Sequence, residues 1–313
     1  MAFVVRRIIL LFVTLILISV ITFFVFQILP GDPVRVILGP DADETQIRTM
    51  TKLLGLDQPG YMQYWHLVEG FFRGDLGDSI RFSKPVMALI MDRLPVTLSL
   101  AFYSLILVVV VSIPLGIFAA QRESKWSDFF LSSLTQVGMA IPTFFVGMLF
   151  ILLLAITFKF FSPSGFVPWG ESFIGAIKSL TLPALTIAIP QIAISYRYAR
   201  NAILEQSKLD YVRTARGKGV SERLILFKHV LRNALIPVLT VFGLILAEVI
   251  AGTIVVEQVF SLPGIGKLLI TAVQVRDFPV VQGLVLYIAL VVVVINFLVD
   301  MLYAVLDPRI RIK

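Results

Sequence analysis

The sequence predicts an all-α integral membrane protein with six transmembrane helices. Of its 313 residues, 58% are hydrophobic and 15% are charged, whereas an ordinary soluble domain carries about 25% charged residues. A soluble fold has too little interior for that much apolar surface. Six segments with at most one charge reach the roughly 20 residues that a helix needs to cross the hydrocarbon core. They are residues 8–31, 94–121, 129–158, 179–196, 233–256 and 278–299.

The character of these segments favours uncleaved membrane helices. They are continuously apolar rather than alternating, which is typical of membrane helices and not of barrel strands. Arg6 and Arg7 precede the first segment, but its apolar stretch exceeds the roughly 7–15 residues of a signal-peptide core. Pro142, Pro183 and Pro190 lie within spans, where we expect bends.

The distribution of Lys and Arg predicts the orientation of the spans. An even number of spans places both termini on one side, together with residues 122–128 and 197–232. That side carries 16 of the 27 Lys and Arg residues and six acidic residues, whereas the opposite side carries 11 of each. The side rich in Lys and Arg faces the cytoplasm. Because this charge is spread over four loops beside lipid, it does not indicate nucleic-acid binding.

Three regions follow from this topology. Residues 1–31 form the N-terminal tail and first span, residues 32–93 an extracytoplasmic helical cap, and residues 94–313 a five-helix core that contains a cytoplasmic loop at 205–236. Within the cap we expect one helix at 43–54, a second after Pro59 and a short third helix after Pro85.

The loop at 205–236 has local signals for two helices and a turn. Asp210 can cap a short helix, and Gly217 and Gly219 can end it, since glycine accepts left-handed backbone conformations. Ser221 can cap a second helix at 222–235. From the residues alone, an ordinary basic juxtamembrane loop is an equally good interpretation.

This loop resembles the EAA loop of bacterial ABC-importer permeases, whose core reads E-A-A-x-x-x-G. Arg213, Thr214 and Ala215 stand at the first three positions, and Gly219 follows after three residues. Only the second alanine and the glycine match literally. The departures are those of the peptide and nickel branch of the family, whose D-Y-x-R-T-A-R-x-K-G run matches residues 210–219.

Segments along nearly the whole chain are similar to the same branch, in the same order. These are residues 29–33, 54–59, 74–77, 229–237, 256–257, 262–266 and 300–311. The resemblance implies the architecture of a type I ABC importer permease in the bacterial cytoplasmic (inner) membrane. It also implies a role as the first permease subunit of a dipeptide or oligopeptide importer.

The resemblance implies partners and a coupling site. The partners are a second homologous permease, two ABC ATPase subunits and an extracytoplasmic substrate-binding protein. The implied ATPase-coupling residues are Asp210, Tyr211, Arg213, Thr214, Ala215, Arg216, Lys218 and Gly219. No Walker A motif is present: neither Gly217-Lys218 nor Gly266-Lys267 is followed by Ser or Thr. We therefore expect no enzymatic activity and no cofactor in this chain, with ATP and Mg²⁺ bound by the ATPases.

Charged and turn-forming residues near the fifth span are candidates for a translocation pathway. Ionisable residues inside membrane spans are costly and are usually functional or paired. Glu248 lies within the span, Glu257 lies near its outer end, and Pro263 and Gly264 follow in the next loop. Pairing with a neighbouring helix is the alternative role for the carboxylates. Snorkelling accounts for Arg197 and Arg200 at the cytoplasmic end of the fourth span.

Other functions remain open at this point. An ion-coupled carrier would use Glu248 and Asp300 as proton sites and need no ATPase, although no inverted repeat is visible. A structural scaffold would have no pathway at all. Within the resembling family, nickel and glutathione importers have similar permeases, so the substrate is open. Neither a catalytic site nor a metal site is expected.

Overall fold

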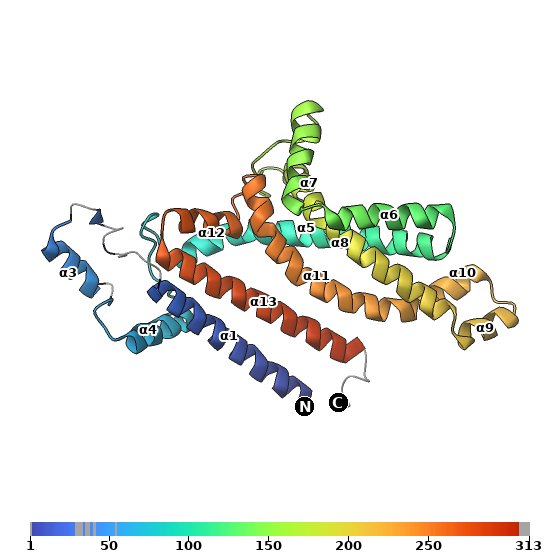
Figure 1. The fold of residues 1–313 in the computed structure, drawn as a ribbon, viewed down its shortest axis with the longest axis horizontal. Coiled ribbons are helices and arrows are strands. Elements are labelled where there is room, and N and C mark those ends of the chain that lie inside the picture. The colour runs from blue at the N-terminus through green and yellow to red at the C-terminus, as the bar shows by residue number, and fades with distance from the viewer. Residues whose placement is uncertain (1, 29–33, 35–37, 40–41, 54, 307–313) are drawn as a thin grey trace. The chain divides into compact units, whose positions relative to one another are not determined.

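The computed structural model describes residues 2–28, 34, 38–39, 42–53 and 55–306, most of which are helical (Figure 1). The predictions for residues 29–33 and for the tail from 307 onward lie outside the described residues. The chain divides into two compact units. The first comprises Met1–Pro95 and Gly264–Phe297, and the second Val96–Pro263 and Leu298–Lys313.

Within the described residues, five helices are long and apolar enough to cross a membrane, or six if one bent pair counts as a single span. This agrees with the six predicted spans. Four of the spans are single helices: α1 (Ala2–Ile28), α5 (Val86–Ala120), α8 (Phe173–Ser207) and α13 (Phe278–Leu306). A fifth is a continuous run of α10 (Glu222–Leu224), η2 (Ile225–Val230) and α11 (Leu231–Val259). The bent pair consists of α6 (Trp126–Ala140) and of α7 (Thr143–Phe150) continued by η1 (Ile151–Thr157).

The first unit contains both helices predicted between 43 and 73. They are α3 (Glu44–Leu53) and α4 (Gly60–Arg73). The predicted short helix after Pro85 is instead the beginning of α5, which continues without a break to Ala120. A buried apolar core joins this part of α5 to α12 (Ile265–Gln274) and the start of α13, with Val86, Ile90 and Leu284 fully buried.

A buried carboxylate ties together two distant segments of the first unit. Asp277 is 1% exposed and directly precedes α13. It accepts hydrogen bonds from the Ser79 hydroxyl at 2.6 Å, the Arg81 amide at 3.1 Å and the Ile80 amide at 3.3 Å. The Ser79 oxygen accepts a further bond from the Phe82 amide at 2.8 Å. This network satisfies the polar groups of the turn between α4 and α5.

The second unit is built around α8, which packs against α6, α7 and α11. Helix α8 comes close to α5 at Gly116, where an added Cβ atom would lie only 2.8 Å from the Cβ of Ala199. Small residues allow such close backbone approach between membrane helices. Gly116 therefore holds the end of α5 close to the part of α8 that leads into the loop at 205–236.

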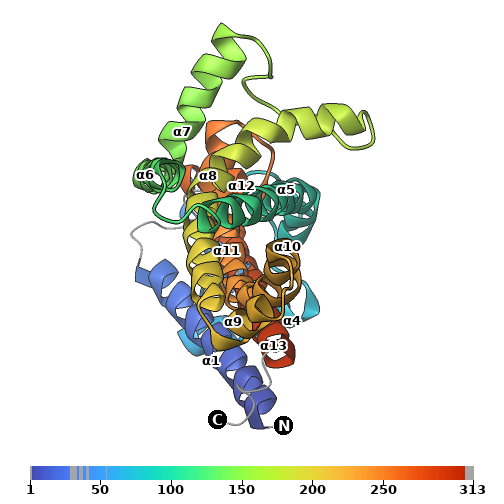
Figure 2. The same ribbon diagram turned by 90° about the vertical axis from the view of Figure 1, so that its right-hand side faces the viewer.

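The predicted span at 129–158 is sharply broken. The axes of α6 and of the α7–η1 helix differ by 100° (Figure 2). Pro142 is the N-cap of α7, where a missing amide hydrogen costs little because the first helical amides have no intrahelical partner. Pro183 and Pro190, by contrast, lie inside an unbroken α8. Only the first of the three prolines therefore marks a break in its span.

We expect Asp277→Ala to destabilise the protein, because the buried groups that donate to the carboxylate would lose their acceptor. Hydrogen bonds to charged groups contribute about 1.5–3 kcal/mol each. The melting temperature in detergent should therefore fall well below that of Asp92→Ala, which removes an exposed carboxylate from α5. Equal melting temperatures for the two variants would contradict this role.

Candidate functional site

The loop at 205–236 contains a short helix, α9 (Asp210–Gly217), that directly follows α8 (Figure 1). Leu209 is its N-cap residue and makes no side-chain capping bond. The prediction that Asp210 caps this helix is therefore wrong, since Asp210 is its first helical residue. The carboxylate still interacts favourably with the helix dipole from the first turn.

A glycine turn ends α9, as predicted. Gly219 has φ +77°, and its amide donates to the carbonyl of Arg216 at 3.0 Å. The next amide, that of Val220, donates to the carbonyl of Ala215 at 3.2 Å. A Cβ atom on Gly219 would meet nothing within 4 Å. The need for glycine is therefore conformational and not a matter of space.

The helical run after the turn differs from the prediction. Ser221 stands at the N-cap of α10, but its side chain makes no capping bond. The run passes through the π-helix η2 into α11, so the predicted helix at 222–235 does not end before Pro237. π-turns are rare and often occur at functional sites. The loop is thus continuous with the fifth span.

An apolar cluster fastens α9 to the ends of α8 and α11. Its six buried members come from four elements that meet at this end of the second unit. Val212 is the contribution of α9 and is fully buried. The other members are Ile203 on α8, Ile225, Leu226 and Val230 on η2, and Ala234 on α11. The cluster therefore places α9 in direct contact with α8, η2 and α11.

Tyr211 adds a polar connection between the same elements. Its hydroxyl donates to Oε1 of Gln206 near the end of α8 at 2.9 Å, and accepts from Nδ2 of Asn233 on α11 at 3.3 Å. Asn233 also donates to the carbonyl of His229 at 3.1 Å. Of the coupling residues predicted from the sequence, Tyr211 thus faces the chain's own spans.

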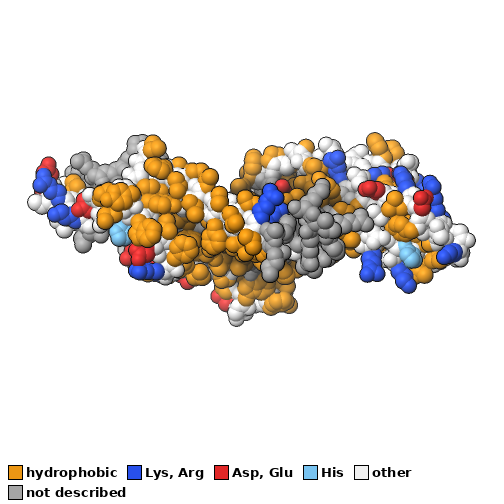
Figure 3. Space-filling model, turned by 90° about the horizontal axis from the view of Figure 1, so that it is seen from below, with side chains coloured by type: hydrophobic (Ala, Val, Ile, Leu, Met, Phe, Trp, Pro, Cys, Tyr) orange, Lys and Arg blue, Asp and Glu red, His pale blue; other side chains and the backbone are white. Residues whose placement is uncertain are grey.

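The outward face of α9 is basic and open. All the predicted coupling residues are exposed except Ala215, which is half-buried. Arg213 pairs with Asp210 at 3.4 Å, and Arg216 pairs with Glu222 at 2.5 Å. The second bond raises the pKa of the Arg216 guanidinium above its ordinary value. Further exposed Lys and Arg side chains gather over α9, α10 and η2 (Figure 3). They include Lys218, Arg223 and Lys228.

The predicted pathway residues have different surroundings. Glu248 is exposed on α11. Glu257 is fully buried and accepts a hydrogen bond from the Thr97 hydroxyl at 2.6 Å. Pro263 is half-buried, and Gly264 is buried just before α12. A pathway role for these four residues stays a prediction.

The second unit contains a charged pair, near the end of α8, that the sequence analysis did not predict. Arg200 on α8 donates to both carboxylate oxygens of Asp128 at the start of α6, each at 2.6 Å. The Ser124 amide donates to the same carboxylate at 3.2 Å. Arg200 is therefore paired and does not merely snorkel. An arginine and an aspartate at two predicted span ends were the available signal, but their partnership depends on tertiary packing.

Comparison with known proteins identifies the family. The family described as "Binding-protein-dependent transport system inner membrane component" matches residues 112–312, and the N-terminal model of such membrane components matches residues 1–101. The chain belongs to this family. It is a multi-pass inner-membrane permease component, as the resemblance of its loop implied.

Several named relatives align over almost the full length. A putative peptide transport system permease of Brucella abortus is 41% identical over 95% of both chains. The oligopeptide transport permease AppB of Bacillus subtilis and the glutathione transport permease GsiC of Escherichia coli K12 are each 38% identical over 99% of both chains. A chain of the MetNI methionine ABC transporter in inward-facing conformations has the same fold, with TM-score 0.57 and 17% identity, over 71% of this chain and 97% of that one.

We expect Tyr211→Phe to loosen α9, because it removes the hydroxyl that joins α8 and α11. A typical hydrogen bond contributes about 1 kcal/mol, so amide hydrogen exchange in residues 210–219 should become several-fold faster. Tyr198→Phe, at an exposed tyrosine on α8, is the matched control. Unchanged exchange in Tyr211→Phe would mean that the apolar cluster alone holds the helix.

We expect Gly219→Val to distort the turn, whereas Gly219→Asn should be tolerated. The left-handed conformation costs an ordinary residue roughly 1–2 kcal/mol, and asparagine adopts it more readily. The measurement is proteolysis of the loop at 205–236 in membrane vesicles, with insertion checked on the same samples. Equal resistance to proteolysis in both variants would contradict a conformational role for Gly219.

Proposed function

We propose that this chain is one of two permease subunits of an ATP-driven importer of small peptides, and that α9 docks on a cytoplasmic ATPase. The arrangement of α9 is the observation that carries the proposal. One side of this helix is buried against α8, η2 and α11, while its other side presents exposed basic and small residues. A helix packed in this way can receive a force on one face and pass it to two spans through the other.

The mechanism that follows is mechanical. Closure of the ATPase pair on ATP moves α9, and the cluster around Val212 together with the Tyr211 hydroxyl transmits the displacement to α8 and α11. Because α11 is continuous with η2, the displacement reaches the spanning part of the helix directly. The pathway then alternates between outward-open and inward-open states, with Glu248 a candidate contact for a cationic group of the substrate.

Peptides are the substrate class that the relatives support. Those named above are permeases for peptides, oligopeptides and glutathione, which is itself a tripeptide. A separate binding protein would deliver the substrate, and a second homologous permease would complete the pathway. ATP and Mg²⁺ would bind the ATPase subunits, since this sequence has no Walker A motif.

Charge reversal on α9 tests the docking. Arg213→Glu should weaken ATPase association roughly tenfold, equivalent to about 1.4 kcal/mol, with a parallel loss of ATP-dependent peptide uptake. Arg48→Glu on α3 is the matched control, because the Arg48 and Arg213 side chains are similarly exposed, at 80% and 74%. The measurements are co-purification of the ATPase from native membranes and uptake of a labelled dipeptide. Full uptake by Arg213→Glu, or uptake driven by an ion gradient without ATP, would contradict the proposal.

A further inference from the structure

The side chains of α6 and α8 form two polar contacts one helical turn apart. In the first, the Arg200 guanidinium donates to both oxygens of Asp128 at 2.6 Å, and the two side chains are only 21% and 6% exposed. In the second, the Ser132 and Tyr196 hydroxyls lie 3.2 Å apart. The contact residues of each helix are four positions apart but in opposite chain directions, so α6 and α8 run antiparallel. These contacts fix α6 to the part of α8 that leads into α9.

The contact between the two helices continues toward the other end of α6. A Cβ atom added to Gly138 would lie 3.6 Å from the side chain of Ile189 and 3.9 Å from that of Ala193. Residues 128–138 make up most of α6. This helix therefore lies along residues 189–200 of α8.

The second half of the broken span, α7, contacts a different set of residues. A Cβ atom added to Gly147 would lie 3.2 Å from the Phe260 ring and 3.3 Å from the Val259 side chain. Val259 is the last residue of α11 and Phe260 is its C-cap, at the end of that helix opposite to η2. The Thr186 side chain, on the earlier part of α8, also lies 3.3 Å away. Helix α6 is thus held near α9, whereas α7 is held at the far end of α11.

Two prolines lie where the contacts of α7 give way to those of α6. Pro142 is the N-cap of α7, at the bend of 100°. Pro190 lies inside α8. Because proline has no amide hydrogen, α8 lacks the backbone bond from residue 190 to the carbonyl of Thr186. The third and fourth spans therefore each have a weak point between the two sets of contacts.

We propose that Asp128 and Arg200 are positioning residues for transport: they make α6 follow α8 while α7 stays with the far end of α11, so that the third span bends at Pro142 in each cycle. The proposal rests on the proposed docking of α9 on an ATPase. Arg200 lies about one turn before Ile203, which packs against Val212 of α9 in the apolar cluster. A bidentate charged pair fixes the orientation of two groups as well as their distance, whereas apolar contacts orient membrane helices less specifically.

A double variant separates this role from a purely structural one. Asp128→Leu with Arg200→Met removes both charges together, so neither charge is left buried without its partner. Replacing a buried ion pair by apolar residues of similar size is often neutral or stabilising. We therefore expect the melting temperature and the amount of co-purified ATPase to match those of the wild type.

The deciding measurement is dipeptide uptake per ATP hydrolysed by the assembled transporter in proteoliposomes. In the double variant this ratio should fall roughly fivefold or more, since coupling between two sites typically changes an equilibrium by at least that factor. Glu69→Leu with Arg73→Met is the matched control, because it removes an ion pair within α4, and it should keep the wild-type ratio. A wild-type ratio in Asp128→Leu with Arg200→Met would overturn the proposal. Absence of ATP-dependent uptake in the wild type would instead contradict the proposed function.

Pulsed electron paramagnetic resonance measures the bend itself. Leu134 on α6 and Ile156 on η1 are 56% and 55% exposed and take no part in the contacts above, so spin labels at Leu134→Cys and Ile156→Cys leave those contacts intact. The partner subunits are supplied without reactive cysteines. We expect ATP to change the distance between the labels in the otherwise native chain, but not in the double variant. A distance that ATP leaves unchanged in the otherwise native chain would overturn the proposal.

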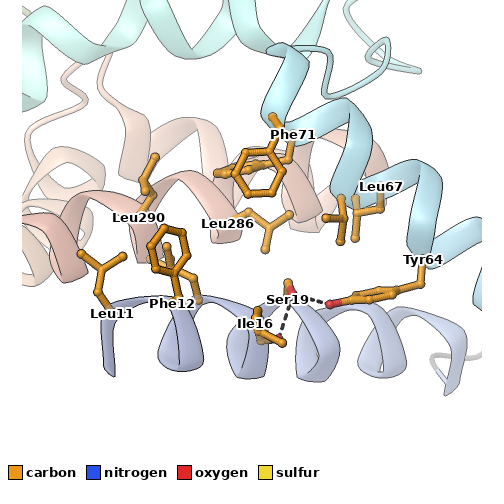
Figure 4. Close-up of a pocket in the computed structure, with 13 residues that line it drawn as sticks. Leu11, Phe12, Ile16, Ser19, Tyr64, Leu67, Phe71, Leu286 and Leu290 are labelled. Atoms are coloured by element: carbon orange, nitrogen blue, oxygen red, sulfur yellow. Dashed lines mark hydrogen bonds between the residues drawn. The ribbon is translucent and has the colours of Figure 1, made fainter. Parts of the chain in front are cut away.

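A milder pair of variants applies if the double variant does not assemble. Tyr196→Phe removes only the hydroxyl that contacts Ser132 on α6. Tyr64→Phe is its matched control, because the Tyr64 hydroxyl lies 2.8 Å from that of Ser19 and joins α4 to α1 in the first unit (Figure 4). Lower uptake per ATP in Tyr196→Phe than in Tyr64→Phe would support the positioning role, and equal ratios would overturn it.

Discussion

The packing of Val212 among the ends of α8, η2 and α11 is the contact on which the proposed mechanism depends. A loop helix held only by its two flanking connections would yield to an ATPase without moving the spans. Here Val212 of α9 packs into a six-residue apolar cluster, and the Tyr211 hydroxyl forms hydrogen bonds with Gln206 and Asn233. The close approach of Gly116 to Ala199 also brings α5 against α8.

A second constraint comes from the bilayer, where polar groups must find partners inside the protein. The Asp128–Arg200 pair joins α6 to α8, and the Thr97–Glu257 hydrogen bond joins α5 to α11. These bonds connect helices that apolar packing alone would orient less specifically, because lipid tails and leucine side chains are equally apolar. Charged residues at the ends of spans thus contribute to the architecture of the helix bundle in addition to any role in transport.

Much of this architecture could be predicted from the sequence, because composition and glycine chemistry are local. Continuous apolar runs located the spans, and Gly219 located the turn. The side-chain contacts between distant segments could not be predicted from the sequence, because Asn233 lies 22 residues from Tyr211 and Arg200 lies 72 residues from Asp128. Pro142 and Pro183 show the same limit, since one marks a break and the other lies in a continuous helix. For the candidate site, the family resemblance implied the residues, but not that the Tyr211 hydroxyl contacts α8 and α11 or that a π-helix joins the loop to α11.

Rigid movement of α9 with α11 is the central claim, and a distance measurement tests it most directly. This chain has no cysteine, so within it spin labels attach only at introduced sites, and the partner subunits are supplied without reactive cysteines. Gly217→Cys on α9 and Leu244→Cys on α11 place the labels at two exposed positions. A Cβ atom at Gly217 would meet nothing within 4 Å, and Gly217 is not among the predicted coupling residues. Pulsed electron paramagnetic resonance of the assembled transporter should give one narrow distance that is the same with and without ATP. A distance that shifts or broadens on ATP binding would show that α9 moves independently of the span and would contradict mechanical coupling through this contact.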